Sequence, residues 1–170
     1  MSTENIILIG FMGAGKTSVG QAYARKTGLP FVDTDQMIEE EASMTISDIF
    51  RLKGEDYFRE TETGVLKKLL SEEDSKVISV GGGLPLREEN RALLKTLGKV
   101  IFLQVTADTV VKRLKGDTTR PLLQGNHVRE RAEELLAFRN PIYRQAASVT
   151  IAVDEKTVDE IVNLIQTEEE

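Results

Sequence analysis

The chain has 170 residues, which is enough for one domain with a substantial core and too few for two comfortable ones. Its 28 Asp and Glu residues exceed its 22 Lys and Arg residues, and the net charge of -6 argues against a broad surface for nucleic acid. It has no cysteine, which excludes disulfides, thiolate metal sites and thiol nucleophiles, and its one histidine, His127, is too few for a metal site made of histidines.

The chain shows no feature of a membrane or exported protein. No apolar run approaches the roughly 20 residues that span a bilayer. No signal-type segment opens the sequence. We therefore expect a soluble, unprocessed, cytoplasmic monomer that has neither a membrane nor a nucleic acid as its partner.

A glycine-rich turn follows the first apolar segment, Ile6 to Ile9, and fits the pattern G-x-x-x-x-G-K-[ST] from Gly10 to Thr17. Backbone N–H groups can wrap a phosphate chain only where the loop turns tightly, which glycine permits. Lys16 would add charge near the β- and γ-phosphates, and the Thr17 hydroxyl is placed to ligate Mg²⁺. A helix over 17–27 would point its N-terminus at the anion. The pattern predicts a nucleoside triphosphate site made of Gly13, Ala14, Gly15, Lys16, Thr17 and Ser18.

The helix is expected to end at Gly28, and residues 31–33 form a short strand. Ligands collect at the carboxyl ends of strands in a parallel sheet, so Asp33 and Asp35 should lie beside the glycine-rich loop. Helices follow over 36–42 and from about Thr45, whose spacing to Asp48 is typical of a helix start, to residue 53. These carboxylates are candidates for a functional role.

A longer helix is predicted over 55–70, with Arg59 and Glu62 on one face, a spacing that by itself predicts no more than a surface ion pair. The next strand, 76–80, runs into Gly81, Gly82 and Gly83. Three residues without a Cβ indicate close approach of another group, and we interpret this group as a small ligand, with a flexible turn as the alternative.

The remaining pattern continues the alternation, with helices over 87–97 and 108–114 around a strand at 99–105. Residues 115–125 are polar and bounded by glycines, and with Arg113 and Arg120 they form the best candidate for a mobile lid. A helix over 126–138 that ends near 139–143, a strand over 148–153 and a helix over 158–165 complete the chain. We predict a three-layer α/β/α P-loop kinase fold around a five-stranded parallel sheet.

Two rival classes have weaker support. A guanine-specific switch would carry an N-K-x-D-type segment, which the sequence lacks. A lid with arginines favours transfer to a bound acceptor over hydrolysis, because it excludes water while it adds positive charge.

Six segments occur in an order that resembles the shikimate kinase family over nearly the whole chain: 10–17, Asp33-Thr34-Asp35, Phe58-Arg59-x-x-Glu62, Gly81-Gly82-Gly83, Arg120-Pro121-Leu122 and Arg139-x-x-x-Tyr143. The resemblance implies strand order 2-3-1-4-5, a substrate-binding region at about 33–62 and a lid at about 113–126, all within one domain. It also implies transfer of the γ-phosphate of ATP to the 3-hydroxyl of shikimate, with Mg²⁺ as cofactor.

The resemblance assigns roles on the acceptor side. Arg59 and Arg139 would hold the shikimate carboxylate, since a guanidinium fork suits a carboxylate. Asp35 would bind the reacting hydroxyls and orient or deprotonate the nucleophile. Gly81 to Gly83 would let the ring approach the backbone, and Glu62 would fix Arg59.

On the ATP side, the resemblance implies that Lys16 and Arg120 neutralise the negative charge of the phosphoryl group during its transfer. Thr17 would ligate the metal, and Asp33 would contact it through water. Arg113 and Lys156 are further candidates for ATP contacts. Lys156 stands about where family members often carry an arginine, so the adenine contacts of segment 154–157 depart from the pattern.

Two alternatives remain open from the sequence. One is a kinase of another small hydroxy acid such as gluconate, and the other is a regulator that binds ATP without transferring phosphate. The presence of Asp35, Arg59, Arg120 and Arg139 together weakens the second alternative.

Overall fold

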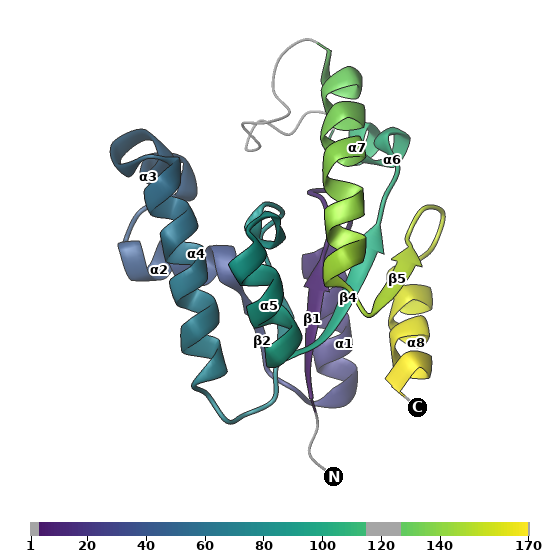
Figure 1. The fold of residues 1–170 in the computed structure, drawn as a ribbon. Helices are drawn as coiled ribbons and strands as arrows, with labels where there is room; N and C mark the ends of the chain where they lie inside the picture. Colours follow the sequence, from purple (N-terminus) through teal and green to yellow (C-terminus); the bar gives the residue numbers. More distant parts are fainter. Residues whose placement is uncertain (1–3, 115–126, 170) are drawn as a thin grey trace.

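The computed structural model describes residues 4–114 and 127–169. Five parallel strands form one sheet in the order β2-β3-β1-β4-β5, as the resemblance implied. The strands are β1 (Asn5–Ile9), β2 (Phe31–Asp33), β3 (Val77–Ser79), β4 (Gly98–Gln104) and β5 (Val149–Ala152). All five have their carboxyl ends at the same edge of the sheet, toward the upper part of Figure 1.

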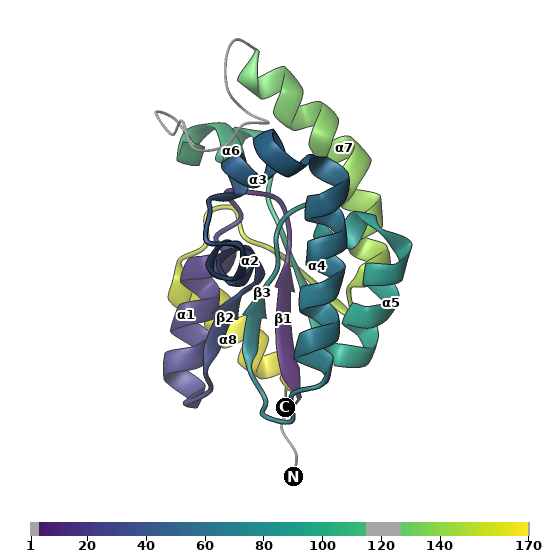
Figure 2. The ribbon, with the colours of Figure 1, turned by 90° about the vertical axis from the view of Figure 1, so that its left-hand side faces the viewer.

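Helices cover both faces of the sheet (Figures 1 and 2), so the layers are α/β/α. α1 and α8 pack together on one face, while α4, α5 and α7 lie on the other. The described helices are α1 (Lys16–Thr27), α2 (Thr34–Ala42), α3 (Ile46–Lys53), α4 (Glu55–Leu70), α5 (Glu88–Leu97), α6 (Ala107–Leu114), α7 (Val128–Ala146), α8 (Val158–Glu169) and the 3₁₀ turn η1 (Leu84–Leu86).

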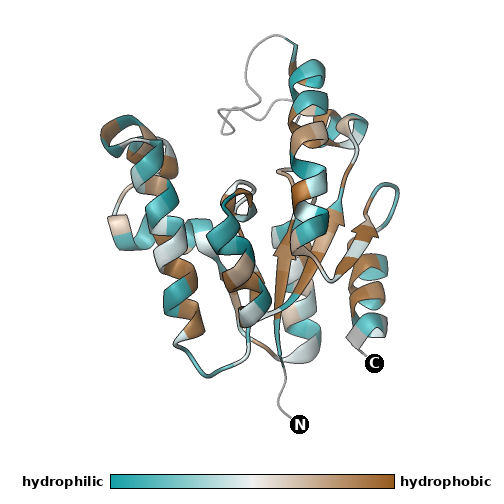
Figure 3. Cartoon of the chain, in the orientation of Figure 1, coloured by the Kyte–Doolittle hydropathy of each residue, from teal (hydrophilic) through white to brown (hydrophobic). Residues whose placement is uncertain are grey.

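The core lies on both sides of the three central strands. Ile6 to Ile9 of β1 and Val77 to Ser79 of β3 are buried, as are residues 100–103 of β4. Figure 3 shows β1 and the upper part of β4 as largely hydrophobic ribbons beside helices with mixed faces. Strands covered on both faces need continuous apolar runs, which explains why the sequence lacks alternation there. Across the described residues, no helix is both long and apolar enough to traverse a bilayer.

Most predicted elements agree with the structure to within one or two residues, but the ends of α7 and α8 were predicted wrongly. α8, expected over 158–165, continues to Glu169. α7 was expected to end near 139–143, yet it continues past Pro141 to Ala146. A proline inside a helix removes one hydrogen bond and costs about 3 kcal/mol. Arg139, Tyr143 and Ala146 lie on the buried face of α7, and their packing offsets that cost. The lid predicted at 115–125 lies outside the described residues.

Side chains set two of the helix starts. The Thr45 hydroxyl accepts a hydrogen bond from the Asp48 N–H at 3.1 Å, as the spacing predicted. α2 begins at Thr34 rather than at residue 36, because Asp33 accepts hydrogen bonds from the first N–H groups of that helix. This earlier start places Asp35 in the first turn of α2.

Gly98→Ala is expected to lower the free energy of unfolding by about 2 kcal/mol. A Cβ at Gly98 would lie 2.3 Å from the backbone oxygen of Asn5, its partner across the β1–β4 ladder, so the strands would have to shift. Gly64→Ala is the control, because a Cβ there meets no atom within 4 Å and alanine favours the helix. That variant should gain about 0.5–1 kcal/mol. Denaturant unfolding of both variants measures their free energies of unfolding. Equal changes in the two variants would mean that the close approach of Gly98 to Asn5 does not limit the size of the residue at position 98.

Candidate active site

The sheet order brings three loops to one edge. β1 pairs with β3 so that Leu8 lies opposite Ser79, and the Val80 N–H donates to the Leu8 carbonyl at 3.2 Å. The glycine-rich loop after β1 is therefore the neighbour of the Gly81 to Gly83 segment after β3. β2 follows on the other side of β3 and ends at Asp33. A ligand at this edge contacts segments that lie far apart in sequence.

The glycine-rich loop has the backbone that the motif predicted. Gly13 and Gly15 have φ angles of 85° and 89°, which favour glycine. Lys16 Nζ donates to the Gly10 carbonyl at 2.5 Å, and Arg113 Nη1 donates to the Gly13 carbonyl at 2.7 Å. Arg113 thus crosses from α6 onto the loop. The positive charges of Lys16 and Arg113, which come from different helices, therefore both lie at the glycine-rich loop.

The start of α1 is open to an anion. α1 begins at Lys16, and its N-cap, Gly15, has no side chain that could cap the first N–H groups. Ala14 is buried and donates to the Phe11 carbonyl at 3.1 Å, while Ser18 is exposed on the first turn. Uncapped N–H groups and the positive end of the helix dipole favour a phosphate at this position.

The two carboxylate oxygens of Asp33 have different partners. Oδ1 accepts from the N–H groups of Asp35 and Gln36 at 2.9 and 3.2 Å, and Thr17 Oγ1 donates to Oδ2 at 3.4 Å. Hard oxygen ligands of this kind suit Mg²⁺, which keeps several waters and binds phosphate oxygens as well. The described residues contain no group of three or more His, Cys, Asp or Glu that could hold a metal ion by themselves. The Thr17 and Asp33 pair therefore fits a metal that arrives with a phosphate ligand.

Arg59 and Glu62 form the ion pair that their spacing predicted, with Nη1 and Oε1 2.7 Å apart. Glu62 is only 1% exposed. Burial raises the pKa of its carboxyl to about 7, although the neighbouring Arg59 guanidinium opposes this shift, and the Asp35 carboxylate adds to it. Arg59, Glu62 and Asp35 therefore form one group of interacting charges beside Gly81 and Gly83.

The three glycines after β3 are pressed against side chains of the site. A Cβ at Gly81 would lie 2.6 Å from Asp35 Oδ1, and a Cβ at Gly83 would lie 2.5 Å from Arg59 Nη1. From the sequence we interpreted the missing side chains as room for a small ligand. The structure adds a second reason, since the Asp35 and Arg59 side chains themselves take the space that a Cβ would need.

Arg139 reaches the same segment from α7. It is 5% exposed, and its Nη1 lies 3.4 Å from where a Cβ of Gly82 would be. Its guanidinium carbon lies 5.5 Å from the centroid of the Phe11 ring. Its Nε atom is buried and has no hydrogen-bond partner among the residues that the structure describes. A buried donor of this kind is costly unless a ligand or water accepts from it.

Sequence reasoning missed Thr34 and a buried network behind Arg59. Thr34 is fully buried and accepts from the Gly81 N–H at 3.1 Å, which ties β2 to the glycine segment. Thr63, on α4, donates to Asn90 Oδ1 at 2.7 Å, and Asn90 Nδ2 donates to the Leu84 carbonyl at 2.9 Å. Thr34 stands between Asp33 and Asp35, so its position in the sequence could have indicated it. The hydrogen bond between Thr63 and Asn90 joins residues 27 positions apart and leaves no local pattern in the sequence.

The loop after β5 lies beside the start of α6. Asp154 accepts from the hydroxyls of Thr106 and Thr109 at 2.9 and 2.5 Å. Burial acts to raise the pKa of Asp154, but these hydrogen bonds together outweigh it and lower the pKa below its usual value. Lys156 Nζ donates to the Ala152 carbonyl at 2.5 Å. This loop is thus fastened to the helix that carries Arg113.

The structure gathers most of the predicted residues at one sheet edge, whereas Lys156 lies on the loop after β5, two strands away from β1. The phosphate loop, the Thr17 and Asp33 pair and the acceptor group all border the carboxyl ends of β1, β2 and β3. Arg120, the predicted lid arginine, lies outside the described residues.

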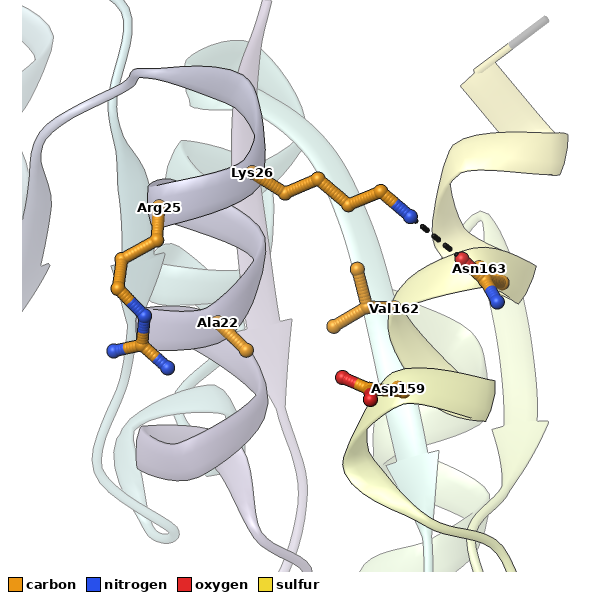
Figure 4. A pocket seen from close by; sticks show the side chains of 6 residues that line it. All are labelled: Ala22, Arg25, Lys26, Asp159, Val162 and Asn163. Carbon is orange, nitrogen blue, oxygen red and sulfur yellow. Dashed lines mark hydrogen bonds between the residues drawn. The ribbon is translucent and has the colours of Figure 1, made fainter.

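A separate groove of about 510 Å³ lies between α1 and α8 (Figure 4). Its lining contains none of the predicted site residues and consists of Ala22, Arg25, Lys26, Asp159, Val162 and Asn163. Lys26 Nζ donates to Asn163 Oδ1 at 2.7 Å across the groove. Four of the lining residues are exposed, and the groove carries both positive and negative side chains. The buried charged groups lie at the carboxyl edge of the sheet instead.

Comparison with known proteins gives a consistent result. A family model described as shikimate kinase matches residues 12–168. The shikimate kinase of Francisella tularensis subsp. holarctica is 41% identical over 165 residues, which cover 97% of this chain and 94% of that protein. The chain belongs to the shikimate kinase family. A solved structure of shikimate kinase from Acinetobacter baumannii in complex with shikimate is similar, with a TM-score of 0.93, 36% identity, and coverage of 99% of this chain and 93% of that one.

A second solved shikimate kinase, from Bacteroides thetaiotaomicron, has a TM-score of 0.88 and 34% identity, and covers 98% of both chains. A deoxyadenosine kinase from M. mycoides is 16% identical with a TM-score of 0.63, which is a likeness of fold alone. Membership of the family makes this chain an ATP-dependent kinase with a P-loop kinase fold.

Glu62→Gln is expected to remove one component of the pH dependence of stability. Between about pH 4.5, the ordinary pKa, and about pH 7, the unfolded state loses the Glu62 proton while the folded state keeps it. The unfolding free energy of the parent protein should therefore fall over this range relative to the variant, by up to about 3 kcal/mol, and the difference should be constant above pH 7. Denaturant unfolding from pH 4.5 to 8 measures it. If the unfolding free energies of the two proteins changed in parallel with pH, the raised pKa of Glu62 would be refuted.

Proposed function

We propose that the protein transfers the γ-phosphate of ATP to the 3-hydroxyl of shikimate, with Mg²⁺ as cofactor. In this proposal residues 1–170 act as one P-loop kinase domain, a monomer in the cytoplasm, with a substrate-binding region at about 33–62 and a lid at about 113–126. The reaction needs an anion cradle for ATP, a separate carboxylate site for shikimate, and a carboxylate that faces the reacting hydroxyl.

The observation that carries the proposal is the buried Nε of Arg139. This donor has no partner among the described residues, and it belongs to a guanidinium next to Gly82. Together with Arg59 at Gly83, it supports a site for a small carboxylate at the edge of the phosphate loop. The residues proposed for shikimate are Asp35, Arg59, Gly81, Gly82, Gly83 and Arg139.

On the ATP side we assign the phosphates to the loop of Gly13, Ala14, Gly15, Lys16, Thr17 and Ser18. Thr17 would hold Mg²⁺ directly and Asp33 through water, which accords with the hydroxyl and carboxylate oxygens that face each other. The metal, when bound, would neutralise charge on the β- and γ-phosphate oxygens. Arg113, already at the Gly13 carbonyl, and Lys156 on the loop after β5 are the remaining proposed ATP contacts.

In the transfer step, Asp35 orients the 3-hydroxyl and takes its proton as the oxygen–phosphorus bond forms. The bond between the γ-phosphorus and the bridging oxygen of ADP breaks at the same stage. Lys16, together with Arg120 from the lid, stabilises the charge that develops on the transferred group. Asp35 lies at the Gly81 backbone beside Glu62, which holds Arg59 in place through their ion pair.

The function is tested with a coupled assay of ADP release in the presence of Mg²⁺ and a panel of acceptors. We expect the kcat/KM for shikimate to exceed that for gluconate or nucleoside monophosphates by at least about 100-fold. Only shikimate carries a ring carboxylate for Arg59 and Arg139 together with vicinal hydroxyls for Asp35. Preference for gluconate would favour the other hydroxy-acid kinase. ATP binding without any acceptor-dependent turnover would favour the regulator.

Arg59→Ala is expected to raise the KM for shikimate by about 100-fold and to change the KM for ATP by less than about twofold, because Arg59 is assigned only to the acceptor carboxylate. Arg51→Ala is the matched control, since Arg51 on the neighbouring helix α3 pairs with Asp48 at an exposed position. Steady-state kinetics with each substrate varied in turn measure the effect. Equal losses for both substrates would mean that the assigned role is wrong.

A further inference from the structure

Tyr143 has no role in the reaction as described so far, yet it lies directly behind the acceptor site. It sits one helical turn after Arg139 on α7 and is fully buried. Its hydroxyl donates to the Gly82 carbonyl at 2.5 Å. Its ring packs on Phe102 of β4, with the ring centroids 5.1 Å apart. One side chain therefore connects the central sheet, the helix that carries Arg139 and the glycine segment.

The hydroxyl is a donor at any pH where the enzyme would work. Burial raises the pKa of Tyr143, and the Arg139 and Arg59 guanidiniums only partly oppose this shift. The proton therefore stays on the phenolic oxygen and is available to the Gly82 carbonyl. The hydrogen bond does not switch as the carboxylates nearby change their charge.

The bond acts on the central peptide of a turn, which the Leu84 N–H closes by donating to the Gly81 carbonyl at 3.1 Å; this turn bond does not involve the Gly82 carbonyl itself. Gly82 and Gly83 carry no side chain, so rotation about their backbone bonds meets little steric resistance. The peptide bond that joins them is planar, and its C=O and N–H point in opposite directions. A fixed Gly82 carbonyl therefore fixes the direction of the Gly83 N–H as well. The Gly83 backbone is the part of the segment on which the Arg59 guanidinium lies.

The same bond sets the distance between α7 and the glycine segment. Arg139 Nη1 and the Tyr143 hydroxyl oxygen lie 3.4 and 3.7 Å from where a Cβ of Gly82 would be. Both side chains come from successive turns of one helix. A shift of the Gly82 peptide away from Tyr143 would therefore also change the gap between the Arg139 guanidinium and the segment that faces it.

We propose that Tyr143 is a positioning residue for shikimate, whose hydroxyl holds the Gly82 peptide and thereby the spacing between the Arg139 and Arg59 guanidiniums. The inference rests on the proposed function. The phenolic oxygen does not touch the reacting atoms, so its effect appears in substrate affinity and orientation. A role in packing alone would need the ring and not the hydroxyl.

Tyr143→Phe separates these roles, because it removes one oxygen and keeps the ring against Phe102. We expect the KM and the directly titrated Kd for shikimate to rise about 10-fold, since the Gly82 carbonyl loses its donor and the peptide gains freedom. The KM for ATP should change by less than about twofold. Tyr23→Phe is the matched control, because Tyr23 is also buried, at 4% exposed, but lies on α1 across the sheet. It should leave the KM for shikimate unchanged.

Three results would overturn the proposal. One is an unchanged shikimate KM with a lower melting temperature, which would mean that the hydroxyl serves stability alone. Another is an equal loss for both substrates. The third is a Tyr143→Phe protein that does not fold by circular dichroism. Failure of the proposed function is distinguishable, because the parent protein itself would then show no turnover with shikimate.

Discussion

The pairing of β1 with β3 is the constraint on which the site depends. Because these parallel strands are neighbours in register, the loop that would hold the phosphates and the segment that would face the acceptor lie side by side. The hydrogen bond from the Val80 N–H to the Leu8 carbonyl extends this pairing to the point where both loops begin. Both strands are buried on their two faces, so a slip of one residue would move every side chain to the opposite face and disrupt its packing there. The fold thereby sets the distance over which a phosphoryl group would move.

Side chains from three helices then use the space that the glycines leave. Asp35 from α2 and Arg59 from α4 lie against Gly81 and Gly83, and Arg139 from α7 lies beside Gly82. Each of these polar groups is wholly or partly withdrawn from water, so they are held by specific partners such as Glu62. This arrangement explains why a substitution that only adds a methyl group to this segment would disturb the charged groups directly.

The sequence alone predicted those parts of the structure that depend on short, local patterns. The glycine-rich loop, the buried strands and the start of α3 at Thr45 all follow from short patterns with a physical cause. The strand order came from the family resemblance, because continuous apolar strands do not specify their neighbours. The continuation of α7 past Pro141 depends on the burial of Tyr143 and Ala146, and the raised pKa of Glu62 depends on its burial. Both effects arise from tertiary packing, which local patterns do not record.

A crystal structure of the protein with shikimate, Mg²⁺ and a non-hydrolysable ATP analogue would show whether shikimate binds at the glycine segment. We expect the shikimate carboxylate to lie on Arg59 and Arg139, with the Arg139 Nε donating to it. The 3-hydroxyl should lie between the Asp35 carboxylate and the γ-phosphate position beside Lys16. Shikimate bound elsewhere, for instance in the groove between α1 and α8, or turned so that its carboxylate faces Lys16, would contradict the account.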